Sequence, residues 1–289
     1  MTLVACVSAA LLGGCGDKDK KSNEAPPLEK EGYVLDWHDE FEGTELDKTK
    51  WLDYSQPHRT EYPEGSKAKY TVKDGVLSLY IDRDSKDFFT GETGGFRVSS
   101  IQTYNKNGLH IGETVREVEP FDGYHTKYGY FELRCKRPAC EGGGAIAWWM
   151  VGIEADSEDG TDSQQNVEID IFENLYTGKH TNWIKLHPWD DPNLFDQEMP
   201  VALDENIDYV NEWHVYGMDW RPDSLTFYLD GEEIAKFNQA PQYDLMMYLS
   251  MYTNDDPNYW AGGAADDIYP KTWEIDYVRV YKDVNGYSE

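Results

Sequence analysis

The sequence predicts an all-β fold, a sandwich or jelly roll, over residues 32–283. Three observations support this class. Short runs rich in Val, Ile, Tyr, Phe and Trp recur from Tyr33 onward, Gly, Pro, Asp and Asn separate them, and no sustained helical periodicity is present. Regularly spaced short strands with turn residues between them are typical of two packed antiparallel sheets. Because the composition does not change along this stretch and no repeat is visible, we expect one domain.

The individual strands are recognised from alternation and from the turns that bound them. Val76–Ile81 follows the turn residues Asp74 and Gly75, and the segments Tyr128–Arg134 and Trp213–Trp220 alternate in the same way. Asp-Gly between two apolar runs is a strong signal for a hairpin. We therefore expect a hairpin of Ser224–Leu229 with Glu232–Phe237 around Asp230-Gly231.

The composition excludes several classes of function. The 289 residues (33.3 kDa) include 26 basic and 55 acidic side chains, which give a net charge of −29 and a pI near 4.4. A protein that follows a phosphate backbone needs a basic surface, so no nucleic-acid partner is expected. The same charge argues against heavily sulfated substrates. Aromatic residues make up 14% of the chain, which excludes a disordered acidic chain.

The first 31 residues are expected to lie outside the domain. Residues 1–14 are uncharged and too short to span a bilayer, and they resemble the apolar core of a secretory signal. Leu12-Gly13-Gly14-Cys15 resembles the lipobox of bacterial lipoproteins, although no Lys or Arg precedes the apolar run. Residues 1–15 are therefore predicted to be a signal peptide with lipobox, with Cys15 as the lipidated residue.

Residues 16–31, with their many charges and Pro26-Pro27, are predicted to be a flexible tether. This arrangement predicts secretion across the inner membrane and a lipid anchor in the outer membrane, on its periplasmic or its cell-surface face. The N-terminal lipid would be the sole membrane contact, and the protein itself is expected to be a monomer.

Two cysteines remain in the domain, Cys135 and Cys140, on either side of Lys136–Ala139. An oxidising compartment permits a disulfide between them, and two buried free thiols are the alternative. Without a CxxC pair, the cysteines predict no zinc site.

The most informative stretch is Glu168-Ile169-Asp170-Ile171-Phe172-Glu173. Successive side chains of a strand point to opposite faces, so Glu168 and Asp170 share one face and the isoleucines share the other. Glu173 has the wrong parity for a regular strand. One extra residue, a β-bulge near Phe172, returns it to the face of the other two acids.

Three carboxylates in a row are costly, because like charges repel and raise one another's pKa. Retaining glycosidases need such an arrangement, with one carboxyl as nucleophile and a second as acid and base. A third acid can share a proton with the nucleophile. The alternative is a solvated acidic face in an acidic protein.

The same stretch resembles the bulged E-x-D-x-x-E signature of glycoside hydrolase family 16. Other segments match that family in order along nearly the whole domain: Trp37–Phe41, Leu46–Trp51, Tyr128–Arg134, Ala147–Met150, Trp213–Tyr216, Phe227–Gly231 and Glu274–Tyr281. The resemblance implies a concanavalin A-like jelly-roll β-sandwich with a substrate cleft across its concave sheet.

It also implies the chemistry: Glu168 as nucleophile, Asp170 as its helper and Glu173 as acid/base in retaining endo-hydrolysis of a β-linked polysaccharide. No cofactor is implied for the reaction. A structural calcium near the first and last strands is an option, with Glu40 and Asp276 as candidate ligands. The acidic turn Asp156–Asp162 lacks the spacing of an EF-hand loop.

Three further residues are candidates for substrate binding. In the segment Thr181–His187, Trp183, Lys185 and His187 share the face opposite Ile184 and Leu186. The resemblance places a His near the acid/base, so His187 is predicted to bond substrate or Glu173, and a surface histidine is the alternative. Trp149 matches a family Trp that stacks on sugar, and core packing is the alternative. Trp183 is the third candidate, and Trp148 and Trp189 stay undecided.

Departures from the family pattern concern the substrate. Gly143–Ile146 replaces the W-P of laminarinases, the segment from Gln102 to Tyr128 is long, and Leu245–Asn254 lacks the Gly-Gly ending of glucan-specific members. A laminarinase-like β-1,3-glucanase and an endo-β-galactosidase are thus both open. Transglycosylation is open too, since a sugar can replace water. A non-catalytic glycan-binding surface lipoprotein is the alternative function, disfavoured because all three acids are present.

Overall fold

The computed structural model describes residues 24–89, 95–106, 114–154, 165–256, 258, 260–261 and 268–287. The predicted signal peptide, Cys15 and the Asp156–Asp162 turn lie outside these ranges. Within them, no helix is long and apolar enough to cross a membrane.

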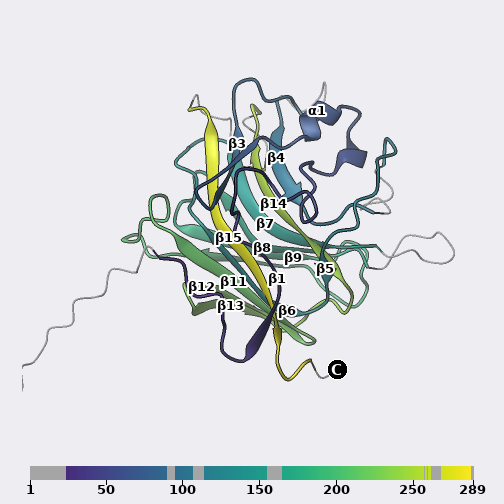
Figure 1. Cartoon of the computed structure of the whole chain (residues 1–289), viewed down its shortest axis with the longest axis vertical. Coiled ribbons are helices and arrows are strands. Elements are labelled where there is room, and N and C mark those ends of the chain that lie inside the picture. The colour runs from purple at the N-terminus through teal and green to yellow at the C-terminus, as the bar shows by residue number, and fades with distance from the viewer. Residues whose placement is uncertain are drawn as a thin grey trace, which may run out of the picture.

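The chain folds into two antiparallel sheets packed face to face, which confirms the predicted jelly-roll sandwich (Figure 1). The outer sheet has the strand order β13-β12-β11-β6-β15-β3-β2, with β1 paired to β15. Its strands are β1 (Tyr33–Asp39), β2 (Tyr70–Lys73), β3 (Val76–Ile81), β6 (Gly129–Cys135), β11 (His214–Arg221), β12 (Ser224–Leu229), β13 (Glu232–Phe237) and β15 (Lys271–Asp283).

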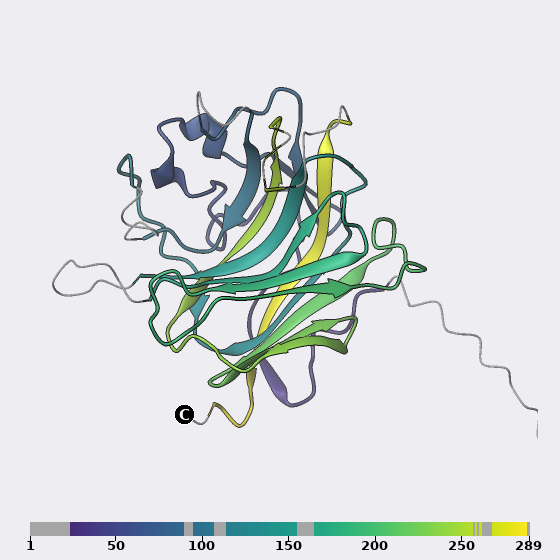
Figure 2. The ribbon, with the colours of Figure 1, turned by 180° about the vertical axis from the view of Figure 1, so that it is seen from behind.

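The inner sheet has the order β10-β9-β8-β7-β14-β4, with β5 paired to β14. Figure 2, seen from behind, brings its teal and green strands to the front. Its strands are β4 (Arg97–Gln102), β5 (His125–Thr126), β7 (Gly144–Gly152), β8 (Glu168–Leu175), β9 (Thr181–His187), β10 (Gln197–Ala202) and β14 (Leu245–Thr253). The 3-10 helix η1 (Pro57–Arg59) and the short helix α1 (Pro63–Ser66) lie beside β3 and β4.

The predicted turns have the backbone that tight hairpins need. Asp74 and Gly75, between β2 and β3, have φ of 54° and 77°, and Asp230 and Gly231, between β12 and β13, have φ of 51° and 82°. Two successive positive φ values make a type I′ turn, whose twist matches that of the flanking strands. The hairpin predicted around Asp230-Gly231 is therefore confirmed.

The core lies between the two sheets. Trp148 on β7 and Phe172 on β8 meet Trp273 on β15 there, and all three are fully buried. Because alternate side chains of each inner strand are used in this core, the others project from the opposite face of the inner sheet. That second face carries the acidic residues.

The predicted tether ends earlier than expected. The carbonyls of Pro26 and Pro27 accept hydrogen bonds of 3.0 and 3.2 Å from Arg279, and the Lys30 ammonium lies 3.1 Å from the carboxylate of Glu132. Residues 26–30 thus pack along the outer sheet, because the backbone of a Pro-Pro segment offers unpaired carbonyls to the buried arginine. Residues 26–30 therefore do not form a free tether in the structure.

Candidate active site

The predicted bulge is present on β8. Asp170 pairs with Trp149 of β7, but Trp148 pairs with Phe172, so Ile171 is an extra residue on β8. Ile169, Ile171 and Phe172 are all in the core. The extra residue changes the parity of the strand and turns Glu173 toward the face of Glu168 and Asp170. The bulge thus lets one strand place three carboxyls on one face while its apolar side chains stay buried.

Two of the three acids, Glu168 and Asp170, lie in surroundings that oppose ionisation. Asp170, in the middle, is 2% exposed, and burial first and the neighbouring charges of Glu168 and Glu173 second raise its pKa well above the usual range. Burial also raises the pKa of Glu168. Desolvation and like charges both favour the neutral acid. Asp170 therefore keeps its proton to a higher pH than an exposed aspartate does, and in that form it can donate a hydrogen bond.

Lys185 on β9 is the cation of the site. Its ammonium lies 2.6 Å from Oε2 of Glu173, and in the strand register it stands opposite Asp170. Burial disfavours its charge, but the carboxylates of Glu173, Asp170 and Glu198 outweigh that and raise its pKa. Lys185 thus stays charged and orients Glu173. The period-two pattern placed it on this face, but pairing with Glu173 depends on the cross-strand register.

His187 lies at the other end of the row from the position predicted for it. In the antiparallel register it stands opposite Glu168, not Glu173, because β9 runs back along β8 and its last residue meets the first residue of β8. Its Nδ1 is 2.8 Å from the carboxylate of Asp196. Of the two partners predicted for His187, Glu173 is therefore corrected, whereas substrate stays a prediction, because a place beside Glu168 keeps His187 on the acid face.

Trp189, left undecided by the sequence, contacts the first acid directly. Its Nε1 donates a hydrogen bond of 3.0 Å to Oε2 of Glu168, and its ring stacks on His187 at 5.2 Å between centroids. The hydrogen bond lowers the pKa of Glu168 against the larger effect of burial. Trp189 is 57% exposed. No spacing in the sequence points to it, since it lies in the turn after β9.

The other tryptophans occupy different surroundings. Trp148 is fully buried in the core between the sheets. Trp149, opposite Asp170, is 6% exposed, stacks on Tyr248 at 4.1 Å and donates to the Ser250 hydroxyl at 2.9 Å. Trp183, on β9, is partly exposed and stands opposite Pro200 of β10. Trp149 thus forms the floor beside the acids, and Trp183 offers more open surface to a sugar.

The candidate calcium ligands do not fit a calcium site. Both carboxylate oxygens of Glu40 accept hydrogen bonds from Arg279, at 2.9 and 2.7 Å, and Asp276 is paired with Arg134. A carboxylate neutralised by a guanidinium is a poor ligand for a hard cation. In the described part of the chain, no three His, Cys, Asp or Glu side chains converge as metal ligands.

Cys135 and Cys140 are not joined by a disulfide in the structure and both thiols are buried, which favours the second of the two alternatives. Burial raises the pKa of the Cys135 thiol to about 12.

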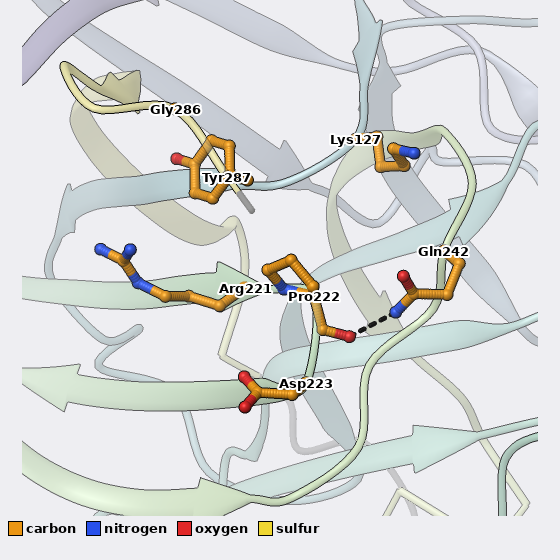
Figure 3. A pocket seen from close by; sticks show the side chains of 7 residues that line it. All are labelled: Lys127, Arg221, Pro222, Asp223, Gln242, Gly286 and Tyr287. Carbon is orange, nitrogen blue, oxygen red and sulfur yellow. Dashed lines mark hydrogen bonds between the residues drawn. The ribbon is translucent and has the colours of Figure 1, made fainter. Parts of the chain in front are cut away.

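A cavity of about 710 Å³ lies elsewhere, at the turn between β11 and β12 (Figure 3). Lys127, Arg221, Gln242 and Tyr287 are among the residues that line it. Arg221 is bonded to the carboxylates of Asp219 and Asp283, and Gln242 to the carbonyl of Pro222. These polar groups thus bond within the chain, and none of the three acids of β8 lines the cavity.

Comparison with known proteins gives a consistent assignment. The model of the family described as glycosyl hydrolases family 16 matches residues 120–279. The chain is 27% identical to glucan endo-1,3-beta-glucosidase A1 of Niallia circulans, over 87% of this chain and 38% of that protein. It is 26% identical to beta-porphyranase D of Zobellia galactanivorans, over 92% of this chain and 66% of that protein. The chain thus spans less than two thirds of the length of both relatives.

Among solved structures, the GlcNAcα1-4Gal-releasing endo-β-galactosidase from Clostridium perfringens is 39% identical, with a TM-score of 0.84. The match covers 93% of this chain and 67% of that one. The catalytic domain of an endo-1,3-beta-glucanase (laminarinase) from Thermotoga petrophila shares the fold at 21% identity and a TM-score of 0.64, over 88% of this chain and 99% of that one.

Proposed function

The chain belongs to glycosyl hydrolase family 16, and from that membership we propose that it is an endo-acting, retaining β-glycosidase whose substrates are galactose-containing glycans. The observation that carries the proposal is the bulged strand β8, which places Glu168, Asp170 and Glu173 on one face. The structural arrangement fits the chemistry that two carboxyls perform in double displacement.

In the first step, we propose, Glu168 as carboxylate attacks the anomeric carbon, while Glu173 in its protonated form gives its proton to the oxygen of the leaving sugar. The bond from the anomeric carbon to that oxygen breaks, and a covalent glycosyl–Glu168 ester forms. In the second step Glu173 takes a proton from water, the water oxygen attacks the same carbon, and Glu168 leaves as carboxylate. Two inversions give net retention.

The neighbouring residues have roles that follow from their contacts. Asp170 is buried and its pKa is raised, so in its protonated form it can stabilise the carboxylate that leaves in the second step by donating a hydrogen bond. Trp189 donates to the same carboxylate, and Lys185 orients Glu173 through the 2.6 Å contact. Trp149, Trp183 and His187 remain proposed substrate contacts, and Trp183 is more open to a sugar ring than the buried Trp149.

Two features support galactose-containing glycans over β-1,3-glucan as substrate. First, the sequence departs from the laminarinase pattern at several segments. Second, the chain is 39% identical to a protein described as an endo-β-galactosidase but only 21% identical to the Thermotoga petrophila laminarinase. The net charge of −29 favours neutral chains.

The experiment is a reducing-end assay on laminarin, agarose, carrageenan and poly-N-acetyllactosamine, with product masses to separate hydrolysis from transglycosylation. We expect shortened galactose-containing chains from wild type and none from Glu168→Gln or Glu173→Gln. Release from laminarin alone would reject the galactan assignment. No release from any polymer would favour a glycan-binding protein without catalysis.

We also propose that Cys15 carries a lipid that anchors the protein in the outer membrane. The supporting observation is the Leu12–Cys15 motif after an uncharged apolar run. Labelled palmitate should be incorporated into wild type and not into Cys15→Ala, which should be released from the membrane fraction. Incorporation into both would reject the site.

A further inference from the structure

We propose that four aromatic rings at the rim where β4 and β14 pair form an additional sugar-binding site beyond the Glu173 end of the acid row. This aromatic platform consists of Phe89, Phe96, Tyr252 and Trp260. The proposal rests on the proposed function, which it deepens: the platform holds an uncharged hexose of the same glycan, away from the bond that is cleaved, and makes the protein prefer long chains.

The platform lies on the same face of the inner sheet as the acids. Tyr252 on β14 pairs with Ala145 on β7, and Ala145 pairs with Leu175 on β8, two residues after Glu173. Tyr252 is thus two strand spacings from β8, or about 10 Å. Ser250, which shares a face with Tyr252, accepts the hydrogen bond of Trp149, and Trp149 stands opposite Asp170.

The charges of the acids also reach this residue. After burial, which is the largest cause, the carboxylates of Glu173, Glu168 and Asp170 contribute to raising the pKa of the Tyr252 hydroxyl. The strand register and these charges thus both place Tyr252 near the acid row. In Figure 1, β4 and β14 lie side by side in the upper part of the molecule, with β7 next to β14.

The rings are arranged as a layered surface. Phe89 stacks on Phe96 at 6.0 Å between centroids, and Phe96 stacks on Tyr252 at 5.7 Å, with interplanar angles of 21° and 18°. Trp260 meets Tyr252 edge to face at 6.1 Å. Phe96 is buried, whereas Phe89 and Trp260 are 40% and 46% exposed. Exposed aromatic rings gathered over a buried ring base are typical of a binding surface.

A neutral sugar suits this surface better than a charged one. Aromatic rings offer flat apolar faces to the C–H groups of a pyranose, and the sugar hydroxyls stay in water. Arg97, at the start of β4, is held between Asp87 at 3.3 Å and Asp255 at 3.0 Å, so its charge is taken up within the chain. Because two carboxylates, those of Asp87 and Asp255, surround this one guanidinium, a negative charge remains that repels sulfate or carboxylate groups on a glycan.

The test measures glycan binding separately from catalysis. Glu173→Gln protein, which cannot digest the polymer, is run on native gels that contain laminarin or poly-N-acetyllactosamine. Phe89→Ala and Trp260→Ala are each added to that background. Trp213→Ala is the matched control, because Trp213 lies just before β11 in the outer sheet, against Arg134 and Lys136. Thermal melts check that each variant is folded.

We expect poly-N-acetyllactosamine to retard the parent, and each platform variant to bind it about threefold to tenfold more weakly, while the control binds as the parent does. Equal retardation of parent and platform variants overturns the proposal, and so does a parent that neither polymer retards. The proposal is also overturned if light scattering shows that the parent is a dimer and that Trp260→Ala makes it a monomer, because a second copy of the chain would then cover the rings.

The two proposals fail differently. If wild type cleaves no polymer but the platform variants still lose retardation, the platform stands and the catalytic assignment falls. If wild type cleaves poly-N-acetyllactosamine, and the platform substitutions change neither the retardation by this polymer nor the rate of its cleavage, the catalytic assignment stands and the platform falls.

Discussion

Trp189→Phe tests whether the hydrogen bond from Trp189 lowers the pKa of Glu168, the carboxyl that we propose as nucleophile. The substitution removes the Nε1–H group that donates to Glu168 at 3.0 Å. A phenyl ring can still stack on His187, as the indole does at 5.2 Å. The change is therefore confined to one hydrogen bond, made at the end of the row away from Glu173.

A hydrogen bond to a charged group contributes about 1.5–3 kcal/mol. Trp189 is 57% exposed, so solvent screening reduces this to about 1 kcal/mol. That energy favours the ionised form of Glu168, which is the nucleophilic form, and about 1 kcal/mol is about fivefold in an equilibrium. Because the hydrogen bond lowers the pKa of Glu168, its loss raises that pKa further.

The assay is kcat/KM against pH for wild type and Trp189→Phe on one cleaved glycan. On the acid side, where activity falls as Glu168 takes up a proton, we expect the variant to be about fivefold slower, with its acid limb displaced to higher pH. On the plateau the two should agree within about twofold. A uniform loss at every pH would refute the reasoning, because it would assign Trp189 to substrate binding. An acid limb displaced to lower pH would refute it too.

Three further predictions use the same contacts. Asp170→Asn should raise Tm at pH 8 and raise it much less at pH 4. Because the pKa of Asp170 is raised in the folded protein, its contribution to stability is present at low pH and is lost as pH rises through the folded pKa. Each kcal/mol of stability that the amide restores at pH 8 corresponds to about 2–4 °C in Tm, measured by calorimetry. Lys185→Met leaves Glu173 without its cation in a mostly buried site, and we expect kcat/KM to fall about tenfold to a hundredfold, whereas an unchanged rate would show that the ion pair does not orient Glu173. Cys135 and Cys140, as buried thiols without a disulfide, should react with a thiol reagent only after denaturation, and a reductant should leave Tm unchanged; a reductant-sensitive Tm would indicate a disulfide.

Local rules predicted the features that depend on neighbouring residues in the chain. Period two, the parity of Glu173 and the apolar character of Ile169 and Ile171 were enough to predict a bulge near Phe172, and the structure contains it. The Asp230-Gly231 turn follows in the same way from the backbone that a tight hairpin requires.

The remaining contacts depend on register between strands, which no local pattern encodes. His187 stands opposite Glu168 and Lys185 reaches Glu173 because of where β9 turns back along β8. Alternation places Trp148 and Trp149 of β7 on opposite faces, but which of them faces the acids depends on the pairing of β7 with β8. Residues 26–30 pack against the outer sheet because the distant Arg279 donates hydrogen bonds to carbonyls of this segment. Neither the charges nor the prolines of the segment predict that contact.

The most direct test of the central claim is the stereochemistry of azide products from variants that lack one acid. With an activated aryl β-glycoside, Glu168→Gly should use azide in place of the nucleophile and give the α-glycosyl azide, through one inversion. Glu173→Ala should form the ester on Glu168, release it to azide and give the β-glycosyl azide. The opposite pairing of variants and products, or β-azide from Glu168→Gly, would contradict the assignment of Glu168 as nucleophile and Glu173 as acid/base.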